Sequence, residues 1–400
     1  MRYLYYFKVL TLSILIFFII YNVSFKFSPL LTTGRMALIF LLLWVFVIGK
    51  LSITYLKSRV WLLFLPFFYV LLQYFIVVDD FGQTSRFIHL FLYSFLGSAL
   101  VALIAKDIKI VLISILLAIT IQSIILLYSF FNIEYRIWFD AVTILGSNYP
   151  AEYLYRAPGF SGDGGASLSL TQSLGVFIGW LLLRDNIYYK PVSGWMVYVV
   201  LLAMTFSFLS CFVVGRTGIT LAAVFLVIFL YSFGLKKRLI LFSVVITVVI
   251  YLFLTFIFTS LVSNDFSVDY FASWIGGLLS SEDKTFSTLA TMNVPLLTLE
   301  TLLGTGLNSI VDGANPSGND SGFIQAYYSM GLIVAVFFYS VYLYILYYAL
   351  KPLPVFIRII LMSLFFLIEV KEPFVFKYSL MFVVMSLHFS HMLFNNRNRI

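Results

Sequence analysis

Twelve apolar runs, most of them about as long as a bilayer is thick, constrain the fold of this chain more than any other feature. A helix needs about 20 apolar residues to cross the hydrocarbon core of a membrane. Only 10% of the residues are charged, against about 25% in soluble domains, so the chain cannot build a water-facing surface. We therefore predict an all-α polytopic membrane protein, a single integral membrane domain over residues 1–400, with about 12 helices near residues 4–22, 36–56, 60–78, 87–105, 108–131, 166–183, 195–214, 217–235, 239–261, 323–349, 355–369 and 374–394.

The distribution of charge predicts which side of the membrane each loop occupies. With the N-terminus inside and the helices alternating, the inside segments carry 16 of the 25 basic residues and 2 of the 17 acidic residues. The opposite orientation would reverse this bias. We therefore expect both termini in the cytoplasm and two long loops, residues 132–165 and 262–322, on the outer face. Arg2 and Lys8 precede a short apolar stretch, residues 9–21, and no small-x-small cleavage site follows it before Lys26, which predicts an uncleaved first helix.

Several kinds of site are not expected from this sequence. The one cysteine, Cys211, lies inside an apolar run and is interpreted as a buried hydrophobe. The three histidines are scattered, so no metal site is predicted. No G-x-x-x-x-G-K-[ST] loop occurs, which argues against ATP-driven work, and no cofactor is expected. The net charge of +8 follows from the membrane orientation and does not indicate a nucleic-acid partner.

Two short clusters combine arginine with glycine on the outer face. The first runs from Arg156 to Gly165 and contains Gly159 and Asp163. Glycine lets backbone approach a ligand closely, and the guanidinium fork suits phosphate oxygens; the alternative is a flexible loop that enters a helix. The second cluster is the turn Gly215 to Gly218, which places Arg216 and Thr217 at the membrane boundary. A charge there is usually paired or functional, although Arg216 could also extend to lipid headgroups.

The long loop 262–322 holds the third cluster. Residues 270–279 and 294–303 have apolar positions at helical spacing and predict short surface helices, which could cap the bundle or guide a substrate. After Gly304 and Gly306 the loop is rich in turn residues that also suit carbohydrate, among them Asn308, Asp312, Asn315, Asn319, Asp320 and Ser321. Asp320 stands directly before a helix, where its simplest role would be a helix cap.

Other charged residues near the outer face are interpreted as structural. Asp79, Asp80 and Arg86 lie in or beside a short outer loop. Glu369 and Glu372 are close in sequence to Lys371 and Lys377, and these four residues could pair with one another.

Taken together, these residues resemble the O-antigen polymerases of the Wzy type, which are related to the O-antigen ligases. The resemblance covers essentially the whole chain: about 12 helices, both termini inside and two large outer loops. It rests on Arg156 with Gly159, on the turn Gly215 to Gly218, and on Gly304 and Gly306 followed by residues 319–322. Each motif is loose, and their order along the chain carries the comparison.

The resemblance implies a metal-independent glycosyltransferase in the bacterial inner membrane. Such an enzyme joins oligosaccharide repeats carried on undecaprenyl pyrophosphate at the periplasmic face, and undecaprenyl pyrophosphate leaves. By the resemblance Arg156 and Arg216 bind pyrophosphate, and Asp320 is our hypothesis for the general base. Gly159, Asp163, Thr217, Asn308, Asn319 and Ser321 are the expected substrate contacts. The expected partners are the lipid-linked glycans and the bilayer, with a chain-length regulator and a flippase.

Two other functions fit the same composition. The ligase branch typically has a histidine in the late outer loop, and residues 262–322 contain none, which favours a polymerase. A flippase or other transporter of lipid-linked glycans would carry charges within its helices and show internal repeats. Here the helix centres are almost free of charge and we find no repeat.

Overall fold

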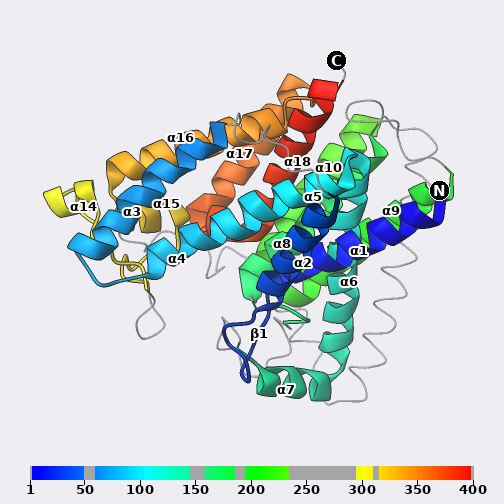
Figure 1. Cartoon of the computed structure of the whole chain (residues 1–400), viewed down its shortest axis with the longest axis horizontal. Coiled ribbons are helices and arrows are strands. Elements are labelled where there is room, and N and C mark those ends of the chain that lie inside the picture. Colours follow the sequence, from blue (N-terminus) through cyan, green and yellow to red (C-terminus); the bar gives the residue numbers. More distant parts are fainter. Residues whose placement is uncertain are drawn as a thin grey trace, which may run out of the picture. The chain divides into compact units, whose positions relative to one another are not determined.

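The computed structural model describes residues 2–48, 59–144, 158–162, 164–184, 194–233, 294–309 and 315–397, and most of these residues are helical (Figure 1). The chain divides into two compact units. Unit 1 comprises Met1–Ile20, Thr33–Ser114 and Met292–Ile400, and unit 2 comprises Tyr21–Thr32 and Ile115–Thr291. Both units are built from helices whose composition is predominantly apolar.

Six helices in the described residues are long and apolar enough to cross a membrane. Four shorter apolar helices accompany them: Tyr5–Tyr21, Thr33–Ile48, Arg216–Phe229 and Ser379–Leu393. These helices support the prediction of a membrane protein with transmembrane helices. The count of about 12 spans and their orientation stay predictions, and the run 239–261 lies outside the described residues. The six are Arg59–Ile76, Gly82–Ala105, Ile108–Phe131, Gly165–Leu183, Trp195–Val214 and Leu332–Ala349.

Unit 1 is an assembly of helices from the two ends of the chain. The helix Gly82–Ala105 is continuous but contains a π-helical segment, η3, between α4 and α5. Gly97 in this segment gives close packing, because a Cβ there would meet Leu38, Ile19 and Phe382 at 3.3–3.5 Å. The elements are α1 (Arg2–Tyr21), α2 (Thr33–Ile48), η2 (Arg59–Leu63), α3 (Phe64–Ile76), α4 (Gly82–His89), η3 (Leu90–Gly97), α5 (Ser98–Ala105), the start of α6 (Ile108–Phe131), α14 (Leu299–Leu303), α15 (Gly322–Met330), α16 (Leu332–Ala349), α17 (Val355–Lys371), η4 (Phe374–Phe376) and α18 (Tyr378–Arg397).

Unit 2 is centred on a helix that is buried on every side. This helix, α8 (Gly165–Leu183), packs against α9 (Trp195–Val214) and α10 (Arg216–Phe233). Small residues allow the approach, as expected for helices in a membrane: a Cβ on Gly179 would lie 2.1 Å from Met204. Cys211 is fully buried, as predicted. The remaining elements are α7 (Ile133–Val142) and the two-residue strands β1 (Ser24–Phe25) and β2 (Thr143–Ile144), which pair antiparallel.

Three expectations about the elements need correction. The single helix predicted over 323–349 is two helices, because Gly331 between α15 and α16 has a φ of +83°. The surface helix predicted over 294–303 forms only as α14, which begins after the capping residue Thr298. The segment 132–165, predicted as an outer loop, contains a helix, α7, that was not predicted. The surface helix predicted over 270–279 lies outside the described residues.

The break at Gly331 also explains the glycines at the end of α14. A Cβ on Gly304 would lie 2.4 Å from the Gly331 nitrogen, so the two backbones pass in direct contact. The amides of Thr305 and Gly306 donate to the carbonyls of Tyr328 and Ser329, both at 2.9 Å. These two carbonyls are in the last turn of α15, where the helix itself supplies no donor for them. Gly304 and Gly306 therefore join the loop to the broken helix.

Candidate functional site

In unit 2 the turn that carries Arg216 is held tightly against α8. The Ser169 hydroxyl donates to the Gly215 carbonyl and accepts from the Gly218 amide at 2.9 Å. A Cβ on Gly218 would lie 2.0 Å from Ser169 Oγ and 2.3 Å from its carbonyl oxygen. Gly218 must therefore stay glycine for α10 to begin where it does, and the packing fixes the position of the Arg216 backbone.

The predicted glycine cluster enters α8 from the same end. Gly159 has a φ of +57°, and a Cβ there would lie 2.7 Å from Gln122 Nε2. Gln122 holds this loop at both sides of Gly159: its amide donates to the Pro158 carbonyl and accepts from the Phe160 amide, both at 3.2 Å. Gly159 is thus buried and shapes the loop. Arg156 and Asp163, the other predicted residues of this cluster, lie outside the described residues.

Tyr135 on α7 adds a further hydrogen bond to this loop. Its hydroxyl donates to the Gly159 carbonyl at 3.1 Å. Burial, and to a smaller extent the neighbouring Tyr128, raise the pKa of Tyr135 to about 12. The hydroxyl therefore stays protonated at neutral pH and remains a donor to the Gly159 carbonyl.

Two helix N-termini meet beside Arg216. Gly165 is the first residue of α8, and Arg216 is the first residue of α10. A Cβ on Gly215, directly before Arg216, would lie 3.4 Å from the carbonyl oxygen of Gly165. Gly164 precedes α8 and supplies no side-chain cap. Helix N-termini carry a partial positive charge, and a guanidinium adds a full one. Arg216 and Thr217 are half-buried there, so this end of unit 2 is suited to an anion such as a phosphate.

In unit 1, Asp80 organises the loop that follows α14. Its carboxylate accepts from the amides of Asn308 and Ser309, each at 2.8 Å, from the Ser309 hydroxyl at 2.5 Å and from the Gly82 amide at 2.7 Å. Burial by itself raises the pKa of Asp80, but these hydrogen bonds outweigh it and lower the pKa below its usual value. The structural interpretation of Asp80 fits these contacts, and Asn308 is held as part of the same loop.

The segment that leads into α15 contains Asp320. Asn319 and Ser321 are buried, and Asn319 Oδ1 accepts from the Ser321 amide at 2.8 Å. Asp320 between them is exposed, whereas its backbone carbonyl accepts from Gln325 at 3.3 Å. The alternative role of Asp320 as a helix cap is wrong: the residue at the cap position is Ser321, and no side chain caps α15. The carboxylate of Asp320 is therefore exposed and accessible to a ligand.

Arg86 and Glu369 lie close to this segment, although the sequence interpretation treated them as structural. Arg86 Nη1 donates to Gln325 Oε1 at 3.0 Å. The fully buried Glu369 accepts from the Tyr339 hydroxyl and from the Val375 amide, both at 2.8 Å, instead of pairing with a lysine. The sequence does contain a signal for these two residues: Arg86 and Glu369 are charges within otherwise apolar helices, and such charges in membrane proteins usually mark a functional region.

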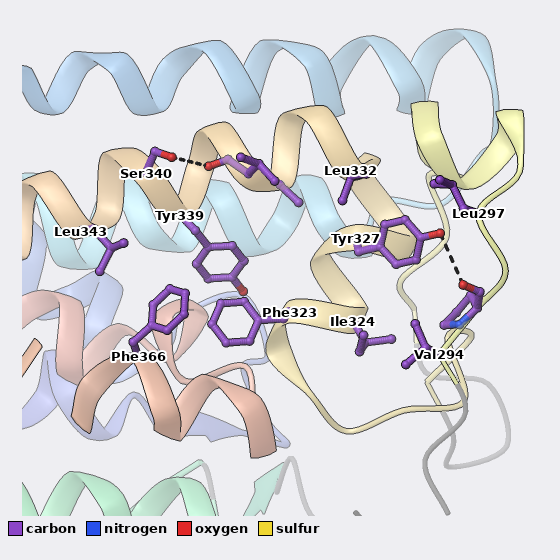
Figure 2. A pocket seen from close by; sticks show the side chains of 13 residues that line it. Val294, Leu297, Phe323, Ile324, Tyr327, Leu332, Tyr339, Ser340, Leu343 and Phe366 are labelled. Atoms are coloured by element: carbon purple, nitrogen blue, oxygen red, sulfur yellow. Dashed lines mark hydrogen bonds between the residues drawn. The ribbon is translucent and has the colours of Figure 1, made fainter. Parts of the chain in front are cut away.

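An apolar groove of about 530 Å³ opens between α15, α16, α17 and the segment before α14 (Figure 2). Its three polar lining groups are turned to protein partners. Tyr327 donates to carbonyls of residues 295 and 296, Tyr339 to Glu369, and Ser340 to Val336. Among the described residues, no charged side chain lines the groove. Its surface is therefore complementary to a hydrocarbon chain, and the volume is that of a typical ligand pocket. The lining residues are Val294, Pro295, Leu297, Phe323, Ile324, Tyr327, Leu332, Ala335, Val336, Tyr339, Ser340, Leu343 and Phe366.

The predicted site residues thus fall into two groups. Gly159, Arg216 and Thr217 belong to unit 2, and Asn308, Asn319, Asp320 and Ser321 belong to unit 1. In unit 1, hydrogen bonds through Asn315 and Ser317 connect Asn308 to Asn319. The meeting of the two groups stays a prediction. No group of three or more His, Cys, Asp or Glu side chains that could hold a metal ion occurs in the described ranges. Comparison with protein-family models, curated proteins and solved structures finds no match to this chain.

Proposed function

We propose that this chain is a membrane glycosyltransferase that polymerises oligosaccharide repeats carried on undecaprenyl pyrophosphate, as an O-antigen polymerase does. The observation that carries the proposal is the end of unit 2, where two helix N-termini meet beside Arg216. Such a site favours a pyrophosphate, and in a membrane protein it favours one attached to a lipid. The apolar groove of unit 1 supports a lipid substrate independently, because it offers a surface for hydrocarbon alone.

The proposed reaction forms one bond and breaks one. A sugar hydroxyl of one lipid-linked unit attacks the anomeric carbon of the reducing-end sugar of the other. The bond between that carbon and the pyrophosphate oxygen breaks, and its electron pair leaves with undecaprenyl pyrophosphate. Arg216, together with Arg156, stabilises the charge that develops on the leaving group. Asp320 takes the proton of the attacking hydroxyl, a role that its exposed carboxylate allows.

Residues of the surrounding loops position these groups in the proposal. Gly159 lies in the loop before α8, Asp163 precedes the same helix in the sequence, and Thr217 follows Arg216 on α10. In unit 1, Asn308, Asn319 and Ser321 are buried by the loop contacts described above. We propose that these three shape the acceptor region around Asp320 and that substrate contacts come from the exposed atoms beside them.

Deletion of the gene, followed by analysis of the surface polysaccharide, tests the proposal. A polymerase predicts loss of the long-chain ladder with one repeat retained. Loss of every repeat would instead indicate a ligase or a flippase, and these are separated by the membrane side on which the lipid-linked unit accumulates. An unchanged polysaccharide would refute all three functions.

Point variants test the assigned residues. Asp320→Asn, Arg156→Ala and Arg216→Ala should each leave single repeats, whereas Glu300→Gln and Arg59→Ala remove exposed charges elsewhere in unit 1 and should leave the ladder intact. Arg216→Lys tests whether a charge suffices or the planar fork is needed. Full chain lengthening by a normally expressed Asp320→Asn variant would exclude Asp320 as the base.

A further inference from the structure

The first turn of α4 contains buried polar groups that lack hydrogen-bond partners. Gln83 is 1% exposed, and neither atom of its side-chain amide is bonded within the described residues. Thr84 beside it is fully buried, and its hydroxyl likewise has no acceptor in the described part of the chain. Buried polar groups in folded proteins are almost always bonded, and exceptions commonly mark the place of a water or a ligand. This turn is therefore incomplete without a further polar partner.

Arg86 lies three residues after Gln83, on the same face of the helix. It is half-buried, and only Nη1 of its guanidinium is hydrogen-bonded, to Gln325. It makes no ion pair with any carboxylate of the described ranges. The two carboxylates that act on it through space, Glu369 and Asp80, are each occupied by other donors. A guanidinium has five N–H donors, so Arg86 keeps donors for a ligand.

A purely structural role explains this arrangement less well. Gln325 binds Arg86 on one side and the carbonyls of Asn319 and Asp320, at 3.1 and 3.3 Å, on the other. That bridge would need only a neutral donor at position 86. A half-buried cation is costly unless an anion or several acceptors compensate it. Within the described residues the compensation of Arg86 comes from one amide oxygen, from the face of the Phe376 ring 6.0 Å away and from the through-space attraction of Glu369 and Asp80. The bridge does, however, hold the guanidinium in a fixed place beside the loop.

We infer that the first turn of α4 binds an oxyanion of an acidic or phosphorylated sugar, with Arg86 as the anion ligand and Gln83 as the partner of a neighbouring hydroxyl. The guanidinium fork matches two oxygens of a carboxylate or a phosphate. The amide of Gln83 can both donate and accept, as a sugar hydroxyl requires. The site lies in unit 1, one amide bridge from Asp320, and the inference does not depend on polymerisation.

Chemical modification of arginine tests the site directly on the purified full chain in lipid nanodiscs. Phenylglyoxal modifies accessible guanidinium groups, and mass spectrometry reports the rate at each arginine. Glucuronate, glucose 1-phosphate and glucose serve as the probes. Arg59 is exposed and serves as the internal control. We expect glucuronate or glucose 1-phosphate to slow modification of Arg86 by about tenfold at saturation, with Arg59 unchanged and glucose without effect.

The two anionic probes separate the sources of the oxyanion. Protection by glucuronate alone identifies a sugar carboxylate, protection by glucose 1-phosphate alone identifies a sugar phosphate, and protection by both identifies a general oxyanion site. Absence of protection by either probe, or equal protection by glucose, would overturn the inference. Because the readout is binding, it can succeed or fail whatever the surface polysaccharide shows.

Gln83→Leu tests the second ligand group. Replacing a buried amide that has no partner by an apolar side chain should leave thermal stability unchanged or raise it. If Gln83 contacts the ligand, the same variant should need an about tenfold higher probe concentration for half-maximal protection of Arg86. Unchanged protection in Gln83→Leu would remove Gln83 from the site.

Discussion

The substitution Gly218→Ala tests the packing that positions Arg216. The new Cβ would lie 2.3 Å from the Ser169 carbonyl oxygen, whereas an ordinary contact begins at 3.4 Å. The start of α10 must therefore move away from α8 by about 1 Å. The movement also lengthens both hydrogen bonds of the Ser169 hydroxyl.

The expected loss of stability follows from these contacts. Overpacking costs about 1–3 kcal/mol, and each of the two hydrogen bonds contributes about 1 kcal/mol. The better helix propensity of alanine returns at most about 1 kcal/mol. Gly218→Ala should thus lower the free energy of unfolding by about 2–4 kcal/mol. If the proposed function holds, a displacement of about 1 Å at Arg216 should slow chain lengthening by about 100-fold.

Equilibrium unfolding in mixed detergent micelles measures the loss of stability. Ala223→Gly, at an exposed position of the same helix, is the matched control, because it measures how much the difference in helix propensity between alanine and glycine changes the free energy of unfolding. Adding Ser169→Gly should not rescue Gly218→Ala, because the backbone carbonyl of residue 169 still blocks the Cβ. A Gly218→Ala protein as stable as wild type, or full rescue by Ser169→Gly, would refute the packing argument.

Three further predictions concern unit 1. Gly331→Ala should destabilise the chain by about 2–4 kcal/mol in the same unfolding assay, because a φ of +83° and contact with the Leu303 backbone at 2.5 Å both oppose a side chain; an unaffected variant would contradict the α15–α16 break. Because the pKa of Asp80 is lowered by folding, its stabilisation of the loop is fully present above the unfolded pKa of 3.8 and is lost as the pH falls through the lower folded pKa. Amide hydrogen exchange at Asn308 and Ser309 should therefore become faster in that pH range, and in Asp80→Asn it should already be fast at pH 7. Slow exchange in that variant would exclude the role of Asp80. Val336→Trp should obstruct the apolar groove and shorten the polysaccharide ladder, whereas Ile333→Trp, at an exposed position of α16 outside the groove, should not; equal ladders for both would exclude the groove as a lipid site.

The positions of most helices could be predicted from the sequence because runs of about 20 apolar residues have few other solutions in a membrane. The exceptions have local causes. Gly331 breaks a run that is apolar on both sides, and only its contact with Gly304 and Leu303 shows why. The segment 294–298 has apolar periodicity, yet the capping residue Thr298 delays the helix to residue 299.

The candidate site was predictable only in part. Glycines beside Arg216 indicated a tight turn, and the structure adds the contact with α8 that explains them. By contrast, the contact between Arg86 and Gln325 joins residues 239 positions apart. No local pattern in the sequence predicts such a contact, so a charge that looked like a loop residue became part of the region around Asp320.

Reconstitution of the purified chain in proteoliposomes with undecaprenyl-pyrophosphate-linked repeat units tests the central proposal most directly. We expect a ladder of lengthened lipid-linked glycans, with one undecaprenyl pyrophosphate released for each linkage formed and no product from the Arg216→Ala variant. Repeat units that stay single in the presence of folded wild-type protein would contradict it.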